Sequence, residues 1–355
     1  MALEERIEQQ IRGEVLTGAD LAGQALAGLR LDGLLVLESS LQGANLEGAS
    51  LRGCRFVGAD LSGANLAGAD LTEARFDQCR LTGIQARRTI WRGCLIQASD
   101  LAGGDFGQAD FTDAVVSHAD LTGARFAGAA LVNASIFSCP LAETDFSGAD
   151  LTRWTVPDAD LSRCRLDGAD LTMAILKGSC LAGLSWVGCR LTQAVLTEAI
   201  LTGADFSGLD LARVVLSGAK LQGATFRGAR GAYAAFQGAV LDGADLSGAD
   251  FYTANFSGAS LAGADLAGMA APNALFRQAD CSQARFRGAR LAHTDFSHAR
   301  IDGADFTRAD LKGANLHALD PGRARWEGAD LTHVRKTNPE LLAAEIWKSP
   351  LSSTK

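Results

Sequence analysis

The sequence lacks several features that usually announce a membrane or nucleic-acid function. No run of about 18 apolar residues occurs, and the charged opening MALEERIEQQ does not read as a signal peptide. Positive charge is also scarce, because the formal net charge is −8, which excludes a generally basic nucleic-acid binder. We therefore expect a protein of the reducing cytoplasm that contacts neither membranes nor nucleic acid directly.

Tyrosine and proline are rare, with 2 and 6 residues in a chain of 355, whereas glycine is abundant, with 40. The hydrophobic fraction of 47% is large enough for an extended core, so a disordered chain is excluded. A chain of this length usually forms two or three domains, but that expectation applies only to sequences without internal repeats.

The dominant feature is a repeat of five residues. Of the 64 positions between Leu16 and Leu331 whose numbers end in 1 or 6, 59 are Leu, Phe, Ile, Val or Trp. The position two residues earlier is mostly Ala, and the position between them carries 22 Asp and 4 Asn. Because 36 of the 40 glycines lie at numbers ending in 3 or 8, each pentapeptide also has a fixed place for a turn.

A period of five matches neither the 3.6-residue helix nor the two-residue strand repeat, but it fits a short strand followed by a tight corner. The small and large residues then point inward and the residue between them points outward. Eight Phe pairs are separated by 20 residues, against two pairs at each of 5, 15 and 25. Since like residues stack in solenoids, four pentapeptides make one coil.

The pattern A-(D/N)-L-x-x, as in Ala59-Asp60-Leu61, resembles the pentapeptide-repeat family over residues 14–333. The resemblance implies a right-handed quadrilateral β-helix, and the best-known members of that family are DNA mimics that protect topoisomerases. We predict an all-β fold, a right-handed quadrilateral β-helix of about sixteen coils with short helical caps at both ends. The motif itself does not define a function.

Both ends of such a solenoid need a cover. Apolar residues at i, i+4 and i+8 predict a cap helix within residues 1–13, and Asn338 followed by Pro339 is typical of a helix start within residues 334–355. The C-terminal helix serves either as a lid or, as in the gyrase-targeting members, as a dimerisation element. Its apolar residues are Leu341, Leu342, Ile346 and Trp347.

One face differs from the other three at the outward position. Large aliphatic residues occupy eight of its sixteen positions, against three of forty-eight elsewhere. These residues are Val15, Leu35, Leu95, Val115, Ile175, Val195, Val215 and Leu275. We call them the apolar ridge. Exposed ridges often mark contact surfaces, although β-branched residues at such positions also strengthen strands.

A basic patch interrupts the mixed surface charge between Asp77 and Asp100, where no acid occurs. It consists of Arg80, Arg87, Arg88, Trp91 and Arg92. The patch is either an anion or partner site or a solvated basic stretch.

The sequence predicts no catalytic, cofactor-binding or metal-binding residues. Six cysteines occupy the small inward position, where cysteine packs as a compact hydrophobe: Cys54, Cys79, Cys94, Cys139, Cys164 and Cys189. His298 and His317 fall on adjacent coils, but the sequence places no further ligand beside them. The many aspartates belong to the repeat, so we expect no enzyme.

We predict a non-enzymatic interaction scaffold that binds another protein, or a second copy as a homodimer, through the apolar ridge. The alternative is a DNA mimic that binds gyrase, a type II topoisomerase, and protects it from toxins or quinolones. Arg and Lys interrupt the aspartate columns, as at Arg80, Lys220 and Arg230, so gyrase is not the favoured partner. A weaker alternative, based on the opening repeats, is an accessory protein of type VI secretion.

Overall fold

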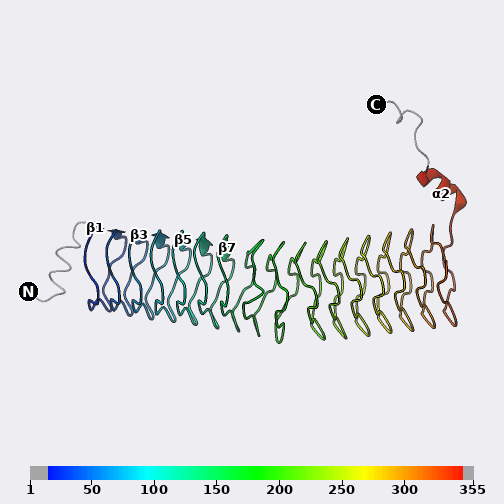
Figure 1. Cartoon of the computed structure of the whole chain (residues 1–355), viewed down its shortest axis with the longest axis horizontal. Coiled ribbons are helices and arrows are strands. Elements are labelled where there is room, and N and C mark those ends of the chain that lie inside the picture. Colours follow the sequence, from blue (N-terminus) through cyan, green and yellow to red (C-terminus); the bar gives the residue numbers. More distant parts are fainter. Residues whose placement is uncertain (1–14, 347–355) are drawn as a thin grey trace, which may run out of the picture. The chain divides into compact units, whose positions relative to one another are not determined.

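The computed structural model describes residues 15–346, which form an all-β parallel solenoid followed by one short helix (Figure 1). Seven strands form a single parallel sheet in the order β1-β2-β3-β4-β5-β6-β7. They are β1 Val15–Thr17, β2 Leu35–Leu37, β3 Arg55–Val57, β4 Arg75–Asp77, β5 Leu95–Gln97, β6 Val115–Ser117 and β7 Ser135–Phe137. The helix is α2, Pro339–Ile346.

Stacked residues are twenty apart, as the phenylalanine spacing predicts. Val36 pairs with Phe56, and Phe56 pairs with Phe76. The rings of Phe56 and Phe76 lie 4.7 Å apart and are inclined by 6°. Four pentapeptides therefore form one coil, and each inward residue stacks on its equivalent in the next coil.

The prediction of about sixteen coils needs correction, because the strand ladder makes only about six turns, from β1 to β7. Beyond Phe137 the spacing of twenty continues as isolated bridges, up to Ile175↔Val195 on the same face and, farther along the chain, from Asp205↔Thr225 to Asn315↔Arg335. Pro157 stands at the third position of what would be the next strand, and proline has no N–H to donate. The fold class is as predicted, but the coils are not equal.

The chain also separates into two compact units, Met1–Ile200 and Leu201–Lys355. The unbroken five-residue register does not predict a boundary at Ile200.

The pentapeptide 61–65, which follows the outward Asp60, uses all five of its backbone donors. The first and third N–H groups donate to carbonyls of the following coil, the fifth donates to the preceding coil, and the fourth closes the turn onto the first residue's carbonyl. The second, that of Ser62, donates to Oδ1 of Asp60 at 2.9 Å. The outward aspartate therefore accepts the one backbone N–H that has no partner in the stacked coils or the turn.

This use of aspartate is general. All 22 outward aspartates accept the N–H of the residue two positions later. The four outward asparagines do the same. The aspartates recur at this position because their carboxylates accept backbone N–H groups, and no further function is needed to account for them.

The core compensates for departures from the repeat by exchanging volume between neighbours. Ile84 and Ala86, which reverse the usual small and large residues, are both fully buried. One coil later the small position is Gly104, where a Cβ would lie 3.1 Å from Ile84 Cγ2 and 2.7 Å from the ring of Phe106. Glycine therefore makes room for the isoleucine, which confirms packing compensation at this site.

The predicted C-terminal helix exists, and Asn338 caps it as expected. Its Oδ1 accepts the N–H groups of Glu340 and Leu341 at 3.0 and 3.2 Å. Leu341 is nonetheless 47% exposed, so this residue of the predicted apolar face is not buried by the coils. The predicted helix at residues 1–13 and Trp347 lie outside the described residues, and we describe no contact of the Ile346 side chain.

Candidate functional site

The structure brings the apolar ridge of the first unit into one column, but as three separate pairs. Val15 pairs with Leu35, Leu95 with Val115, and Ile175 with Val195. The exposed fractions of Val15, Leu95 and Ile175 are 45%, 42% and 40%. Arg55 and Arg75 separate the first two pairs, and Ser135 and Thr155 separate the second from the third.

In the second unit the ridge is weaker. Val215 and Leu275 share a column, but Ala235 and Asn255 lie between them. Leu275 is 36% exposed and Val215 is half-buried. The first unit therefore carries the more extensive apolar surface.

A surface cavity that the five-residue register did not predict lies where the strand ladder ends. Phe137, the one Phe outside the inward positions, is 37% exposed. It lines a cavity of about 450 Å³ together with Cys139, Pro140, Val156 and Pro157. Two prolines within seventeen residues of one another were the available sequence signal, because each removes a donor from the stacking of adjacent coils.

The predicted basic patch is corrected in one respect: Trp91 is not on the surface. It is fully buried, its ring stacks on Phe111 at 5.3 Å, and its Nε1 donates to Thr89 Oγ1 at 2.6 Å. Number 91 is an inward position of the repeat, so the register itself required burial. The patch then consists of arginines alone.

Two of those arginines are neutralised by acids on the next coil. Arg87 lies 3.2 Å from Asp105 Oδ2, and Arg92 lies 2.5 Å from Asp110 Oδ2. Arg88 Nε donates to Gln108 Oε1 at 3.0 Å. Residues 78–99 contain no acid, but the fold places acids of the next coil beside their arginines.

The same pairing occurs along the described part of the chain. Ten outward aspartates face an arginine of an adjacent coil at 2.5–3.9 Å. Their second carboxylate oxygen is used for this contact while the first accepts a backbone N–H. These ten of the 22 outward aspartates therefore contribute little unbalanced negative charge to the surface.

The cysteines behave as core residues. All eight are free thiols, and Cys54, Cys79, Cys94, Cys164 and Cys189 are buried, as predicted, whereas Cys139 is half-buried. Burial raises the pKa of Cys79 to about 11 and that of Cys94 to about 12. A thiol with so high a pKa carries almost no thiolate at neutral pH and is a poor nucleophile.

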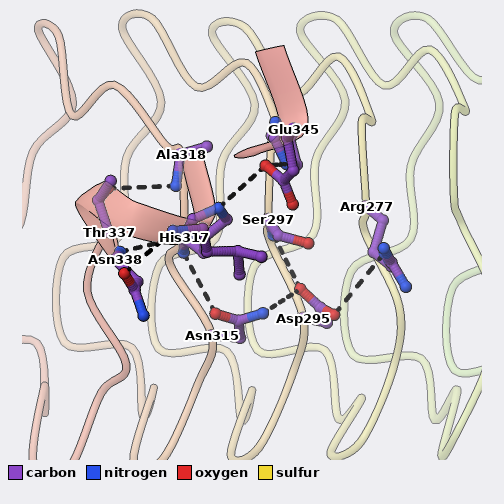
Figure 2. A network of polar contacts seen from close by, with 11 residues as sticks. Arg277, Asp295, Ser297, Asn315, His317, Ala318, Thr337, Asn338 and Glu345 are labelled. Atoms are coloured by element: carbon purple, nitrogen blue, oxygen red, sulfur yellow. Dashed lines mark hydrogen bonds and ion pairs between the residues drawn. The ribbon is translucent and has the colours of Figure 1, made fainter. Parts of the chain in front are cut away.

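The polar cluster that sequence reasoning missed lies in the second unit, where α2 meets the coils (Figure 2). Glu345 Oε2 lies 3.1 Å from Nε2 of His298 and 3.2 Å from Nε2 of His317. The His317 side chain is only 7% exposed, and its Nδ1 accepts the Asn338 N–H at 3.1 Å. The sequence placed the two histidines on adjacent coils, but Glu345, which joins them, lies 28 residues beyond His317, a separation that no repeat specifies.

Hydrogen bonds of the last coils orient this cluster. The His317 N–H donates to Asn315 Oδ1 at 3.2 Å, and Asn315 Nδ2 donates to Asp295 Oδ1 at 2.9 Å (Figure 2). Thr337 Oγ1 accepts the Ala318 N–H at 3.2 Å. The segment that leads into α2 is therefore tied to the coil that carries His317.

The end of the second unit remains partly uncovered. Leu316, Leu319, Trp326 and Leu331 line a largely apolar cavity of about 450 Å³, and no described α2 residue contributes to it. Leu331, an inward residue by its register, is 40% exposed. The described residues of α2 leave this cavity open, and the choice between a lid and a dimerisation element stays a prediction.

Stacked coils of twenty residues, with outward aspartates that cap the turns, define a class of parallel solenoid built from pentapeptides. The chain belongs to the pentapeptide repeat family, whose model matches more than half of it. The matched residues are 39–78, 92–128, 117–153, 144–183, 181–209, 189–228, 210–248, 234–268 and 279–317.

Several solved structures are similar to this chain. QnrB1, a plasmid-mediated fluoroquinolone resistance protein, is 19% identical with a TM-score of 0.33, over 65% of this chain and 93% of that one. HetL, involved in heterocyst differentiation regulation in the cyanobacterium Nostoc sp. strain PCC 7120, is 27% identical with a TM-score of 0.16, over 88% and 96%. A pentapeptide repeat protein of the Arabidopsis thaliana thylakoid lumen is 35% identical with a TM-score of 0.18, over 32% and 68%.

Because these TM-scores are low, the function of this chain does not follow from the three structures. No protein with a curated description matches the chain. Within residues 15–346, no helix has the length and apolar character needed to cross a membrane.

Proposed function

We propose that this chain is a non-enzymatic interaction scaffold that binds another protein through the apolar ridge of its first unit. The observation that carries the proposal is the alignment on one face of aliphatic pairs that each have one exposed member. The pairs Val15/Leu35 and Leu95/Val115 stand four coils apart, which is roughly 19 Å at about 4.8 Å per coil.

The residues between these pairs indicate the chemistry of the partner. Arg55 and Arg75 are adjacent in the sheet and exposed, and within the described chain neither has a carboxylate partner. Like charges on neighbouring strands destabilise a sheet, and a carboxylate from outside relieves that cost. The partner therefore presents acidic residues flanked by apolar side chains, and it contacts both pairs at once.

The chemistry of the described side chains supports the proposal of a non-enzymatic role. The outward aspartates accept backbone N–H groups, and the buried thiols have raised pKa values. The Ser162 hydroxyl donates to the same Asp160 oxygen that accepts the Ser162 N–H, so this hydroxyl–carboxylate pair belongs to the turn. This supports a binding role.

The DNA-mimic alternative, with gyrase as its target, has less support. Mimicry needs a dense negative face, and ten outward aspartates are paired with arginines. We expect no inhibition of gyrase supercoiling at low micromolar protein. A salt-sensitive, stoichiometric inhibition would replace the scaffold with the mimic.

The scaffold is tested with two double variants and one control. Leu95→Ser with Val115→Ser removes an apolar pair, and Arg55→Glu with Arg75→Glu reverses the charge between the pairs. Ile90→Ser alters an outward aliphatic residue on another face and is the control. Proteins captured from cells by the wild-type chain are quantified with each variant, and self-association is measured by sedimentation.

We expect each double variant to lose at least about 10-fold in capture of one acidic partner, while Ile90→Ser retains it. Loss of self-association instead would identify a homodimer as the occupant of the ridge. Unchanged capture and unchanged sedimentation in both double variants would disprove the role of the ridge.

A further inference from the structure

Three metal-ligating side chains from three separate segments converge in the second unit. His298 and His317 come from successive coils, and Glu345 comes from α2. Their donor atoms all lie within 4.8 Å of one another. We propose that these three residues bind one divalent transition-metal ion of the zinc class, and that the ion fastens α2 to the coils.

The distances suit such an ion. Bonds of about 2.0–2.2 Å in a tetrahedral zinc site place neighbouring donor atoms roughly 3.3 Å apart. Glu345 Oε2 is 3.1 Å from one imidazole Nε2 and 3.2 Å from the other. The ion therefore enters between the three atoms with small shifts of the side chains, and water completes its coordination.

The donor types select the metal. Two imidazole nitrogens and one carboxylate oxygen suit Zn²⁺ and its neighbours Co²⁺ and Ni²⁺, whereas Mg²⁺ and Ca²⁺ prefer oxygen ligands throughout. The His298 side chain is 32% exposed and that of Glu345 is 36% exposed. The ion reaches the site from solvent past these two residues.

The proton on His317 changes place when the metal binds. In the metal-free state Nδ1 accepts the Asn338 N–H, so a neutral ring carries its proton on Nε2, facing Glu345. Coordination uses the lone pair of Nε2, so the ring proton moves to Nδ1 and the Asn338 N–H turns away. No net proton is released by a neutral ring, and the lost hydrogen bond weakens binding by roughly 10-fold.

The ion supplies what α2 lacks. The helix has eight residues, and isolated helices of that length are marginal in water. Leu341 is 47% exposed, so apolar burial holds it weakly. Coordination by Glu345 closes the segment between His317 and α2 into a loop and fixes the helix on the coils.

The site is tested on the full chain after treatment with a chelator. Co²⁺ is titrated and its visible spectrum recorded, and the Zn²⁺ affinity is measured by competition with a chromogenic chelator. We expect one ion per chain with a micromolar or lower Kd and a tetrahedral Co²⁺ spectrum. Glu345→Gln and His298→Gln should each weaken binding at least about 10-fold.

Two controls separate this site from adventitious binding. Glu340→Gln changes a carboxylate on the same helix, and His333→Gln changes a histidine outside the cluster; both should bind as the wild type does. Binding that is weaker than about 100 μM, has no fixed stoichiometry or is unaffected by Glu345→Gln would overturn the site.

The fastening role has its own readout. Hydrogen exchange of the amides from Glu340 to Ile346 should slow on addition of Zn²⁺ in the wild type but not in Glu345→Gln. The coils of Glu345→Gln should keep the wild-type thermal unfolding, which shows that the variant is folded. Metal binding without any slowing of exchange in α2 would overturn the fastening.

Discussion

The coils that carry β1–β7 and the coils of the second unit use the same pentapeptide but treat one backbone donor differently. The residues compared are those in the column of the apolar ridge. In the second unit, Oδ1 of Asn255, Asp295 and Asn315 accepts the N–H two residues later at 2.9, 2.9 and 3.2 Å. In β1 to β6 the outward residue is Val, Leu or Arg, which offers no acceptor, and the third residue joins the strand, as in Thr17↔Leu37. An acceptor side chain therefore selects a turn over a strand.

The lack of an acceptor favours a strand, but β7 begins with Ser135, which has a hydroxyl acceptor, and other residues without an acceptor form no strand. Ile175 and Val195 have no acceptor, yet they form only an isolated bridge. They follow Pro157, which interrupts the ladder after β7. Since each coil is the template on which the next one stacks, the turn geometry continues once it has begun.

The largest effect is expected from a charge in the core of the strand-bearing coils. Leu121 is fully buried, and Leu121→Asp places an unpaired carboxylate there. We expect a loss of about 3–5 kcal/mol in the free energy of unfolding of the first unit. Urea denaturation measures it, with Leu241→Asp as the matched variant of the second unit; a loss below about 1 kcal/mol in either would contradict the core assignment.

Acid should weaken both units through the turn-capping aspartates. Hydrogen bonds from the Ser162 hydroxyl and N–H hold the pKa of Asp160 below its usual value, and those from Ser207 do the same for Asp205. A lowered folded-state pKa contributes stability above the unfolded value, which is lost as pH falls through the folded value. The urea midpoint should therefore be constant from pH 7 to about pH 5 and fall below about pH 4.

Overpacking tests whether the two units have equally tight cores. A Cβ on Gly231 would lie 2.2 Å from Cε1 of Phe251, and one on Gly104 would lie 2.7 Å from Cε2 of Phe106. We expect Gly231→Ala to cost about 1–3 kcal/mol and Gly104→Ala to cost less, because its contact is longer. Thermal unfolding of the two variants gives the order, and the reverse order would show that the first unit has the less adaptable core.

A reciprocal exchange tests the acceptor rule with the smallest expected effect. Leu35→Asn gives β2 an acceptor and should release Leu37 from the ladder, whereas Asn255→Leu removes one and leaves the Ser257 N–H without its partner. Each should cost about 1 kcal/mol. Amide exchange at Leu37 and Ser257 should accelerate in the respective variant, and unchanged exchange at both would refute the rule.

The five-residue register specified the coil in nearly all its parts, because inward and outward positions follow from sequence spacing alone. It placed Phe56 on Phe76, and it also placed Trp91 inward, which the surface reading of the basic patch overlooked. The end of the strand ladder at Pro157 could also be predicted from the sequence, since proline has no N–H to donate. Local chemistry and a fixed period were enough for these features.

The cluster at α2 could not be predicted in the same way. The helix start at Asn338 follows from local capping chemistry, but the path of the helix does not. Whether Glu345 or Leu341 faces the coils depends on a few contacts of an eight-residue helix, and the five-residue period ends before it begins. The pairing of arginines with aspartates has the same origin, because partners 18 or 20 residues apart become neighbours only after the coils stack.

The exact spacing of twenty residues bears on how such a gene can change in length. A duplication of the segment 46–65 would add one coil and leave every flanking residue stacked on a residue of the same kind, since Asn45, Asn65 and Gln85 already succeed one another in a single column. A deletion of one codon, by contrast, would turn every following inward side chain toward solvent. Unequal recombination in multiples of sixty base pairs is therefore the route by which this chain can grow or shrink without losing its fold.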